Sequence, residues 1–182
     1  MSHLAAHYAQ KVNGVSQTNA EVAEPLFPGI SIEGLTNGIH HRKWCLPEMA
    51  ALFDRHLPEW RVEPGVLANA AQLPDDELVA ARHASKHELC DYANGTTRSA
   101  LRPDWLTLGF ARRMTPYKRG NLLFHDRKRL LEAAEAVGGL QVVFAGKSHP
   151  KDHDGQAILK SIFEQAQNSG GLLRVVLILS LI

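Results

Sequence analysis

A cluster of basic residues interrupts an otherwise apolar part of the chain. The apolar run that ends at Ala111 is followed, within eight positions, by four cationic side chains: Arg112, Arg113, Lys118 and Arg119. Arginine presents a fork of N–H donors and lysine a compact charge, and both suit phosphate groups. The apolar character then resumes at Leu122. The pattern therefore predicts an anion site where two buried elements meet.

Thr115 and Pro116 predict that a helix begins inside this basic stretch. Thr is a favourable N-cap and Pro a favourable first helical residue. The unpaired N–H groups and the dipole at such a helix start attract anions. Arg112 and Arg113 would then lie on the preceding loop and Lys118 in the first turn. The alternative interpretation is a basic helix start that is only hydrated.

Strand-like and helix-like segments alternate in the second half of the sequence. Strands are predicted at 105–111, 141–145 and 172–179. Helices are predicted at 116–124, at 127–137 and after Asp152, a possible helix cap. This alternation indicates an α/β fold with a parallel sheet and crossover connections. Ligands of such sheets bind beyond the carboxyl ends of the strands, where the basic stretch falls.

The first half of the sequence predicts fewer strands. Apolar residues recur at helical spacing from Leu4 to Val15, and residues 30–35 alternate like a strand. Further helices are predicted to begin at Pro47 and Pro74, the second of them running to about Tyr92. Residues 93–104 are rich in Gly, Thr, Ser, Arg and Pro. We therefore place a boundary between two lobes in this segment.

Composition limits the classes of function. The chain has 182 residues and a formal net charge of +1, so charge alone does not indicate a nucleic-acid or membrane binder. Residues 47–92 carry nine acids and four bases, whereas 105–151 carry three acids and nine bases. The two cysteines are isolated, no signal peptide is visible, and the longest apolar run is too short to span a bilayer. We expect a cytoplasmic protein.

A second loop has the same position relative to its strand as the basic stretch. Gly146, Lys147 and Ser148 follow the strand predicted at 141–145. The glycine allows close approach of the backbone and the lysine adds charge. The Walker spacing of glycines is absent, so this loop is weak evidence for nucleotide binding.

Two long phrases in the second half of the sequence are LTLGFARRMTPYKRGNLLF at 106–124 and LQVVFAGKSHPKDHDGQAILKSI at 140–162. Three shorter phrases precede them: VNGVS at 12–16, TNGIHHRKW at 36–44 and LFDRHLPEW at 52–60. In this order they resemble phrases of the α-glucan (glycogen and maltodextrin) phosphorylases, especially of their shorter bacterial and archaeal branch. The likeness extends to about Val176.

The resemblance implies a fold and an activity. The family cleaves α-1,4-glucans with orthophosphate to release glucose 1-phosphate, and its fold has two Rossmann-like lobes facing a cleft. By position in the motif, Arg113 and Lys118 match residues that hold the substrate phosphate, and Arg112 matches a residue near the cofactor phosphate. The implied cofactor is pyridoxal phosphate, whose phosphate group takes part in proton transfer. Cations offset the repulsion between two neighbouring phosphates.

The resemblance also implies that the chain is an internal fragment. Residues 1–101 would be the C-terminal part of the first, substrate-binding lobe, and 102–182 the N-terminal part of the second, Rossmann-like lobe. A phrase like EASGTSxMK, which carries the cofactor-binding lysine of the family, is absent from the sequence. Asn19 stands where the family usually has His, and residues 177–182 differ from the polar phrase expected there. We therefore expect the chain to be inactive alone.

Other interpretations remain open on the sequence. One is a fragment of a sugar-nucleotide-dependent glucan synthase, and another is a vestigial product or a non-catalytic anion-binding module. His83 and His87 have the i, i+4 spacing of metal ligands, but no third ligand is evident, so we predict no metal site. His40 and His41 follow a turn near the predicted lobe junction and are candidates for a functional role, although a structural role is the favoured interpretation.

Overall fold

The computed structural model describes residues 1–179, and its contacts group the chain into two compact units, Met1–Cys45 and Leu46–Ile182. Residues 180–182, the end of the segment that differs from the expected family phrase, lie outside the described residues. The boundary predicted after residue 101 separates two lobes of a longer protein. These two units do not test it, and it stays a prediction. None of the helices within residues 1–179 combines the length and apolarity that crossing a bilayer requires.

The first unit is built around two short parallel strands. Its elements are α1 (Ser2–Tyr8), β1 (Val12–Gly14), α2 (Gln17–Ala23), the 3₁₀ turn η1 (Glu24–Leu26) and β2 (Ile32–Gly34). The helix predicted from Leu4 to Val15 is therefore wrong beyond Tyr8. Val12 pairs with Ile32 instead, because strand pairing overrides its helical spacing.

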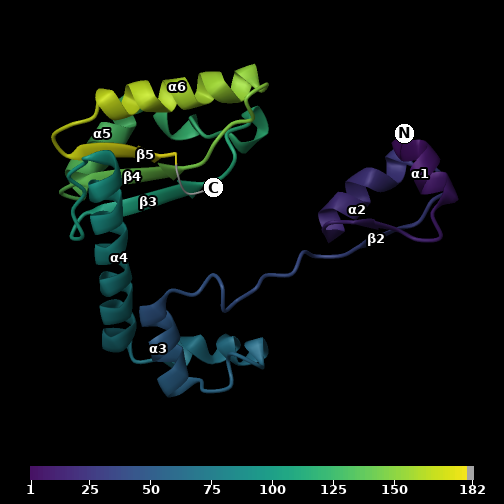
Figure 1. Ribbon diagram of the computed structural model, residues 1–182, viewed down its shortest axis with the longest axis horizontal. Coiled ribbons are helices and arrows are strands. Elements are labelled where there is room, and N and C mark those ends of the chain that lie inside the picture. Colours follow the sequence, from purple (N-terminus) through teal and green to yellow (C-terminus); the bar gives the residue numbers. More distant parts are fainter. Residues whose placement is uncertain (180–182) are drawn as a thin grey trace. The chain divides into compact units, whose positions relative to one another are not determined.

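The second unit contains the main sheet and its helices (Figure 1). In chain order its elements are α3 (Pro47–His56), η2 (Pro64–Gln72), α4 (Asp75–Thr97), β3 (Leu106–Ala111), η3 (Pro116–Lys118), η4 (Leu122–Phe124), α5 (Arg127–Ala136), β4 (Leu140–Ala145), α6 (His153–Gln167) and β5 (Leu173–Ile178). The helices predicted to begin at Pro47 and Pro74 are confirmed, and α4 extends five residues beyond Tyr92.

The main sheet is parallel, with strand order β3-β4-β5. Leu106 pairs with Leu140 and Ala111 with Ala145, while Leu140 pairs in turn with Leu173. The predicted α/β class with parallel pairing is thus confirmed. Because the strands run in the same direction, their carboxyl ends and the loops that follow them lie at one edge of the sheet.

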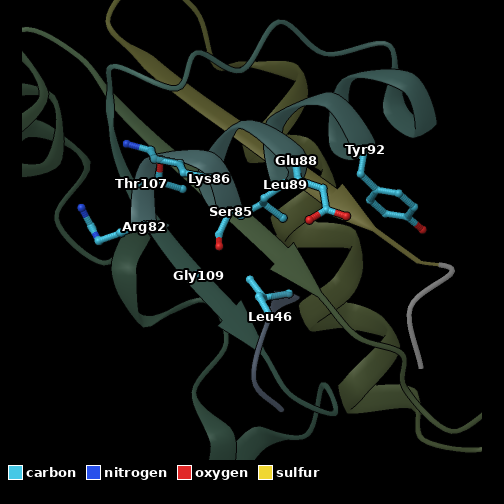
Figure 2. A pocket seen from close by; sticks show the side chains of 9 residues that line it. All are labelled: Leu46, Arg82, Ser85, Lys86, Glu88, Leu89, Tyr92, Thr107 and Gly109. Carbon is cyan, nitrogen blue, oxygen red and sulfur yellow. The ribbon is translucent and has the colours of Figure 1, made fainter. Parts of the chain in front are cut away.

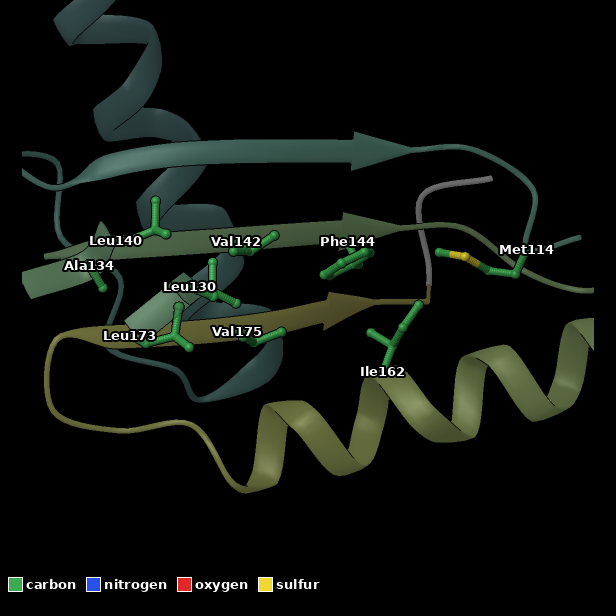
Figure 3. Packing of buried hydrophobic residues seen from close by; sticks show 9 residues of the cluster. All are labelled: Met114, Leu130, Ala134, Leu140, Val142, Phe144, Ile162, Leu173 and Val175. Carbon is green, nitrogen blue, oxygen red and sulfur yellow. The ribbon is translucent and has the colours of Figure 1, made fainter. Parts of the chain in front are cut away.

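Two apolar clusters cover the two faces of this sheet. On one face, Leu130 of α5 and Ile162 of α6 pack with Val142 and Phe144 of β4 (Figure 3). On the other face, Cys90 and Ala93 of α4 pack with a second set of strand residues: Val143, Ala145, Val176 and Ile178. All residues of β4 are buried, as the near-continuous apolar run of a central parallel strand predicts.

Gln141 is the one polar or charged residue that is buried as a whole among the described residues. Its Oε1 accepts a hydrogen bond from Arg102 N at 2.9 Å, and its Nε2 donates to Arg102 O at 2.9 Å and to Thr107 Oγ1 at 2.8 Å. The same Nε2 lies 3.7 Å from Cys90 Sγ. Burial raises the pKa of the Cys90 thiol. The amide of Gln141 thereby links β4 to three other parts of the fold: α4, the segment before β3, and β3 itself.

The edge strand β3 is far more exposed to solvent than the central strand β4. Leu106 and Leu108 of β3 are 46% and 38% exposed, and the described residues include no strand that pairs with its outer edge. The edge at β5 is partly covered, because Leu173 N bonds to Gly170 O and Val175 N to Ser169 Oγ. The strand that leads into the basic loop is therefore the exposed side of this sheet.

Replacing Gln141 tests how far the sheet depends on this amide. Gln141→Leu should lower the free energy of unfolding by about 2 kcal/mol or more, because Arg102 N–H and Thr107 Oγ1 would lose their hydrogen bonds to the amide beside the core. Urea unfolding followed by circular dichroism measures the change. Gln167→Leu, on the exposed end of α6, is the control and should change stability by less than about 0.5 kcal/mol. Equal stability of the two variants would contradict the role of the amide.

Candidate phosphate site

The basic loop continues directly from β3 and remains bonded to the neighbouring strand. Arg112 N donates to Ala145 O at 3.1 Å, and Met114 N donates to Lys147 O at 3.0 Å. Arg112 and Arg113 are exposed, whereas Met114 is fully buried in the cluster beneath α6 (Figure 3). The loop is thus anchored through its backbone and through one apolar side chain, while its two arginines face solvent.

The helix predicted over 116–124 is wrong. The chain forms two separate 3₁₀ turns, η3 and η4, and Arg119 between them has a left-handed backbone with φ of 53°. Thr115 makes no side-chain capping bond, and its buried Oγ1 has no partner in the described part of the chain. The α-helix N-terminus that the sequence predicted beside Lys118 is therefore not formed, and only a three-residue 3₁₀ turn stands there.

Packing against Met114 explains why the chain turns at Arg119. Gly120 is buried, and a Cβ atom there would lie 3.1 Å from Met114 Sδ and 3.4 Å from Ile158 Cγ2. Thr115 and Pro116 are real local signals for a helix start, but tertiary packing limits the helix to one turn.

Lys118 is placed differently from the two arginines. It is half-buried and, with Arg119, lines a hollow of about 460 Å³ whose apolar wall includes Leu108, Phe110 and Phe144. Its Nζ lies 4.7 Å from the centroid of the Tyr117 ring. The structure therefore brings Arg112 and Arg113 together on one loop and places Lys118 beside the apolar hollow next to it. Figure 3 shows Met114 at this end of the sheet.

The second loop lies alongside the basic loop, as the sequence suggested from its position after a strand. The backbone bonds to Ala145 and Lys147 join the two loops, and Lys147 itself is exposed. The predicted cap at Asp152 is confirmed, because its Oδ1 accepts from Gly155 N at 2.9 Å at the start of α6. Two loops at the carboxyl edge of the sheet are thus fastened to each other.

A larger hollow, of about 570 Å³, was not predicted from the sequence. Figure 2 shows it between α4 and β3, with Arg82, Lys86 and Glu88 from the helix and Thr107 from the strand among its lining residues. Lys86 Nζ donates to the carbonyl of Trp105. The only sequence signal for it is the apolar strand 106–111, whose outer side is left open.

The remaining candidates have structural partners. Asn19 N donates to Oγ of Ser16, the N-cap of α2, at 3.0 Å, and Asn19 Oδ1 accepts from Val15 N at 3.1 Å, so Asn19 takes part in the capping of α2. His40 Nδ1 accepts from Lys43 N at 3.2 Å. Within residues 1–179, no three His, Cys, Asp or Glu side chains are grouped as metal ligands would be. His83 and His87 thus have no third ligand there.

Comparison with known proteins decides the family. The sequence model of the carbohydrate phosphorylases matches residues 1–172. The chain belongs to this family. It is 30% identical to the glycogen phosphorylase of Aquifex aeolicus, and the match covers 91% of this chain and 28% of that protein. It is 27% identical to the maltodextrin phosphorylase of Thermococcus litoralis over 92% of this chain and 23% of that protein.

A glycogen phosphorylase of Mycobacterium tuberculosis is 28% identical over 89% of this chain and 22% of its own length. This phosphorylase-family chain therefore spans about a quarter of the length of the curated relatives that it matches. The predicted family is confirmed. The comparisons favour a phosphorylase over the glucan synthase alternative, because these three relatives are all named phosphorylases.

Met114 offers a test of how the basic loop is anchored. Met114→Ala should lower the free energy of unfolding by about 2–5 kcal/mol, because it removes a fully buried side chain from the cluster beneath α6. Met114→Leu conserves most of the volume and should cost less than about 1.5 kcal/mol. Urea unfolding measures both. If Met114→Ala were as stable as Met114→Leu, the side chain would not be the anchor.

Proposed function

We propose that this chain contributes the phosphate-holding half of an α-1,4-glucan phosphorylase, a glycosyltransferase that uses orthophosphate to release glucose 1-phosphate from glycogen or maltodextrin. The observation that carries the proposal is the loop of Arg112 and Arg113. It lies at the carboxyl end of β3, is held by two backbone hydrogen bonds, and leaves both guanidinium-bearing residues exposed. Ligands of open α/β sheets bind at this position.

The roles proposed for the three cations follow from their positions in the phrase at 106–124 that resembles the phosphorylase family. Arg113 and Lys118 would hold the substrate phosphate, and Arg112 would lie near the phosphate of the cofactor. Between Trp105 and His125 the chain has no acidic residue, so these cations are not neutralised by neighbours in sequence. Bringing two phosphates together is unfavourable unless fixed positive charge offsets their repulsion.

Pyridoxal phosphate is the proposed cofactor, and the residues present fit one part of it. The exposed guanidinium of Arg112 suits the phosphate ester, because arginine binds phosphate oxygens with two parallel N–H donors. The cofactor's phosphate supplies a group for proton transfer. The phrase that carries the family's cofactor-binding lysine is not found in these 182 residues, so we assign no covalent attachment to this chain.

We also propose that the main sheet is the first half of a Rossmann-like lobe that begins at about residue 102, with residues 1–101 belonging to a first, substrate-binding lobe. The order β3-β4-β5 corresponds to strands 1-2-3 of a doubly wound sheet, in which a fourth strand pairs with the outer edge of the first. The exposed edge of β3 supports this proposal. Cys45 and Cys90 are not joined in a disulfide, which supports a cytoplasmic location.

Orthophosphate binding by the purified 182-residue chain tests the site. Arg113→Met and Lys118→Met should each weaken binding by about tenfold or more, because each removes a charge-assisted hydrogen bond to the anion. Isothermal titration calorimetry measures the dissociation constant. Lys160→Met is the control, since Lys160 is an exposed cation in the middle of α6 and belongs to neither loop, and it should leave affinity within about twofold. Equal effects of all three variants would indicate general electrostatic attraction and contradict a site.

Catalysis provides a second test. The 182-residue chain, incubated with maltodextrin, orthophosphate and pyridoxal phosphate, should release no glucose 1-phosphate, because the residues that would bind the glucan and fasten the cofactor are not all in this sequence. A coupled assay with phosphoglucomutase and glucose-6-phosphate dehydrogenase detects the product. Release of glucose 1-phosphate above a heat-denatured control would refute the assignment as half of a site.

A further inference from the structure

Two glycines distant in sequence from the basic loop lie against its backbone. Gly146 follows β4, and Gly155 lies in the first turn of α6. Both are buried. Neither touches the loop through a side chain, so no pattern of charges in the sequence draws attention to them.

Gly146 leaves room for the carbonyl oxygen of Arg112. A Cβ atom at residue 146 would lie less than 3.0 Å from that oxygen, closer than Cβ atoms approach other atoms in real structures. The obstructing atom belongs to the backbone, so no side-chain rotation relieves the contact. Any larger residue at 146 must therefore move the peptide group that joins Arg112 to Arg113.

Gly155 has the same relation to the carbonyl oxygen of Met114. A Cβ at residue 155 would come within 3.0 Å of that oxygen, and would also lie 2.8 Å from Asp152 Oδ2 and 2.9 Å from Ser148 Cβ. The start of α6 thus lies directly beneath the loop. Gly120 differs, because a Cβ there would meet only side-chain atoms of Met114 and neighbouring isoleucines, which can adjust.

These contacts fix the backbone on both sides of Arg113. The preceding peptide group is limited by Gly146 through the Arg112 oxygen. The following peptide group is held by the bond from Met114 N to Lys147 O at 3.0 Å. The next carbonyl, of Met114, rests on Gly155. An exposed arginine with few side-chain contacts thereby starts from a backbone that has little freedom.

We propose that Gly146 and Gly155 are positioning residues for the phosphate site, acting through the backbone of Arg112–Met114 to set where the Arg113 guanidinium binds its anion. The inference rests on the proposed function. When a reaction depends on the alignment of the reacting groups, misplacing one of them by about 1 Å can lower the rate about a hundredfold. Bringing the Arg112 oxygen out to an ordinary contact of 3.4 Å or more from a Cβ at residue 146 requires a shift of more than 1 Å.

Gly146→Ala in the 182-residue chain is the central experiment. We expect it to weaken orthophosphate binding by about tenfold or more while the variant stays folded by far-ultraviolet circular dichroism. Gly95→Ala is the matched control, because Gly95 is exposed on α4 and a Cβ there would meet nothing within 4 Å. It should bind within about twofold of the unsubstituted chain. Unchanged affinity of folded Gly146→Ala would overturn the proposal.

A local spectroscopic signal separates positioning from general stability. In the unsubstituted chain, the side-chain Nε–H resonance of Arg113, assigned with Arg113→Met, should shift when orthophosphate is added. In folded Gly146→Ala this shift should be lost or reduced at the same phosphate concentration. A merely structural glycine would lower the unfolding midpoint and leave the shift of the folded molecules intact, and that result counts against the proposal.

Lys147→Met excludes a different explanation. Lys147 follows Gly146, so Gly146→Ala could act by moving this cation. If the glycine positions Arg113, Lys147→Met should keep affinity within about twofold. A loss as large as that of Gly146→Ala would show that the glycine serves Lys147, and would overturn the assignment to Arg113.

The outcomes separate this proposal from the proposed function. No binding by the unsubstituted chain overturns both. Weakening by Arg113→Met but not by Gly146→Ala overturns only the role of the glycine. Should Gly146→Ala fail to fold, Gly155→Ala carries the same test, because Ala is favoured at a helical position. Failure of both to fold would show that the glycines are required for the fold and would refute a specific positioning role.

Discussion

The parallel pairing of β3 with β4 is the constraint on which the cationic loop depends. Near the amino ends of the two strands, the buried amide of Gln141 binds both backbone groups of Arg102. At the carboxyl ends, the pairing continues past the strands through the bond from Met114 N to Lys147 O. The strand register thus determines the position at which the loop begins. The loop backbone in turn determines the positions from which the arginine side chains extend. The exposed side chains of Arg112 and Arg113 thereby extend from a backbone that is held in place.

Much of the fold can be predicted from local signals, because the strongest of them agree with tertiary packing. The apolar run 140–145 becomes a fully buried central strand, and Asp152 caps α6 as its position suggests. The prediction fails at 116–124, where Thr115 and Pro116 favour a helix start. There Met114 must pack against Gly120, and the left-handed backbone of Arg119 ends the turn. Such a contact between buried groups has no local signature.

The candidate site is predictable in its chemistry and less so in its geometry. Arginine and lysine at the end of a parallel strand indicate a phosphate ligand, and the phrases around them indicate the family. The sequence does not show that Lys118 lines a hollow together with Leu108 and Phe110. Nor does it reveal the two glycines, because their importance comes from backbone approach between segments more than thirty residues apart.

Exposure of β3 bears on how selective the cations can be. The strand is apolar and uncharged, yet its outer edge is open and hollows lie on both of its faces. Parallel strands are normally covered on both faces, so the arginines that follow β3 are more hydrated here than they would be in a covered site. Charges in water attract any anion weakly and are screened by salt, whereas the same charges beneath a low-dielectric surface bind strongly. Affinity for phosphate can therefore reside in this chain, while discrimination among anions depends on whatever covers β3.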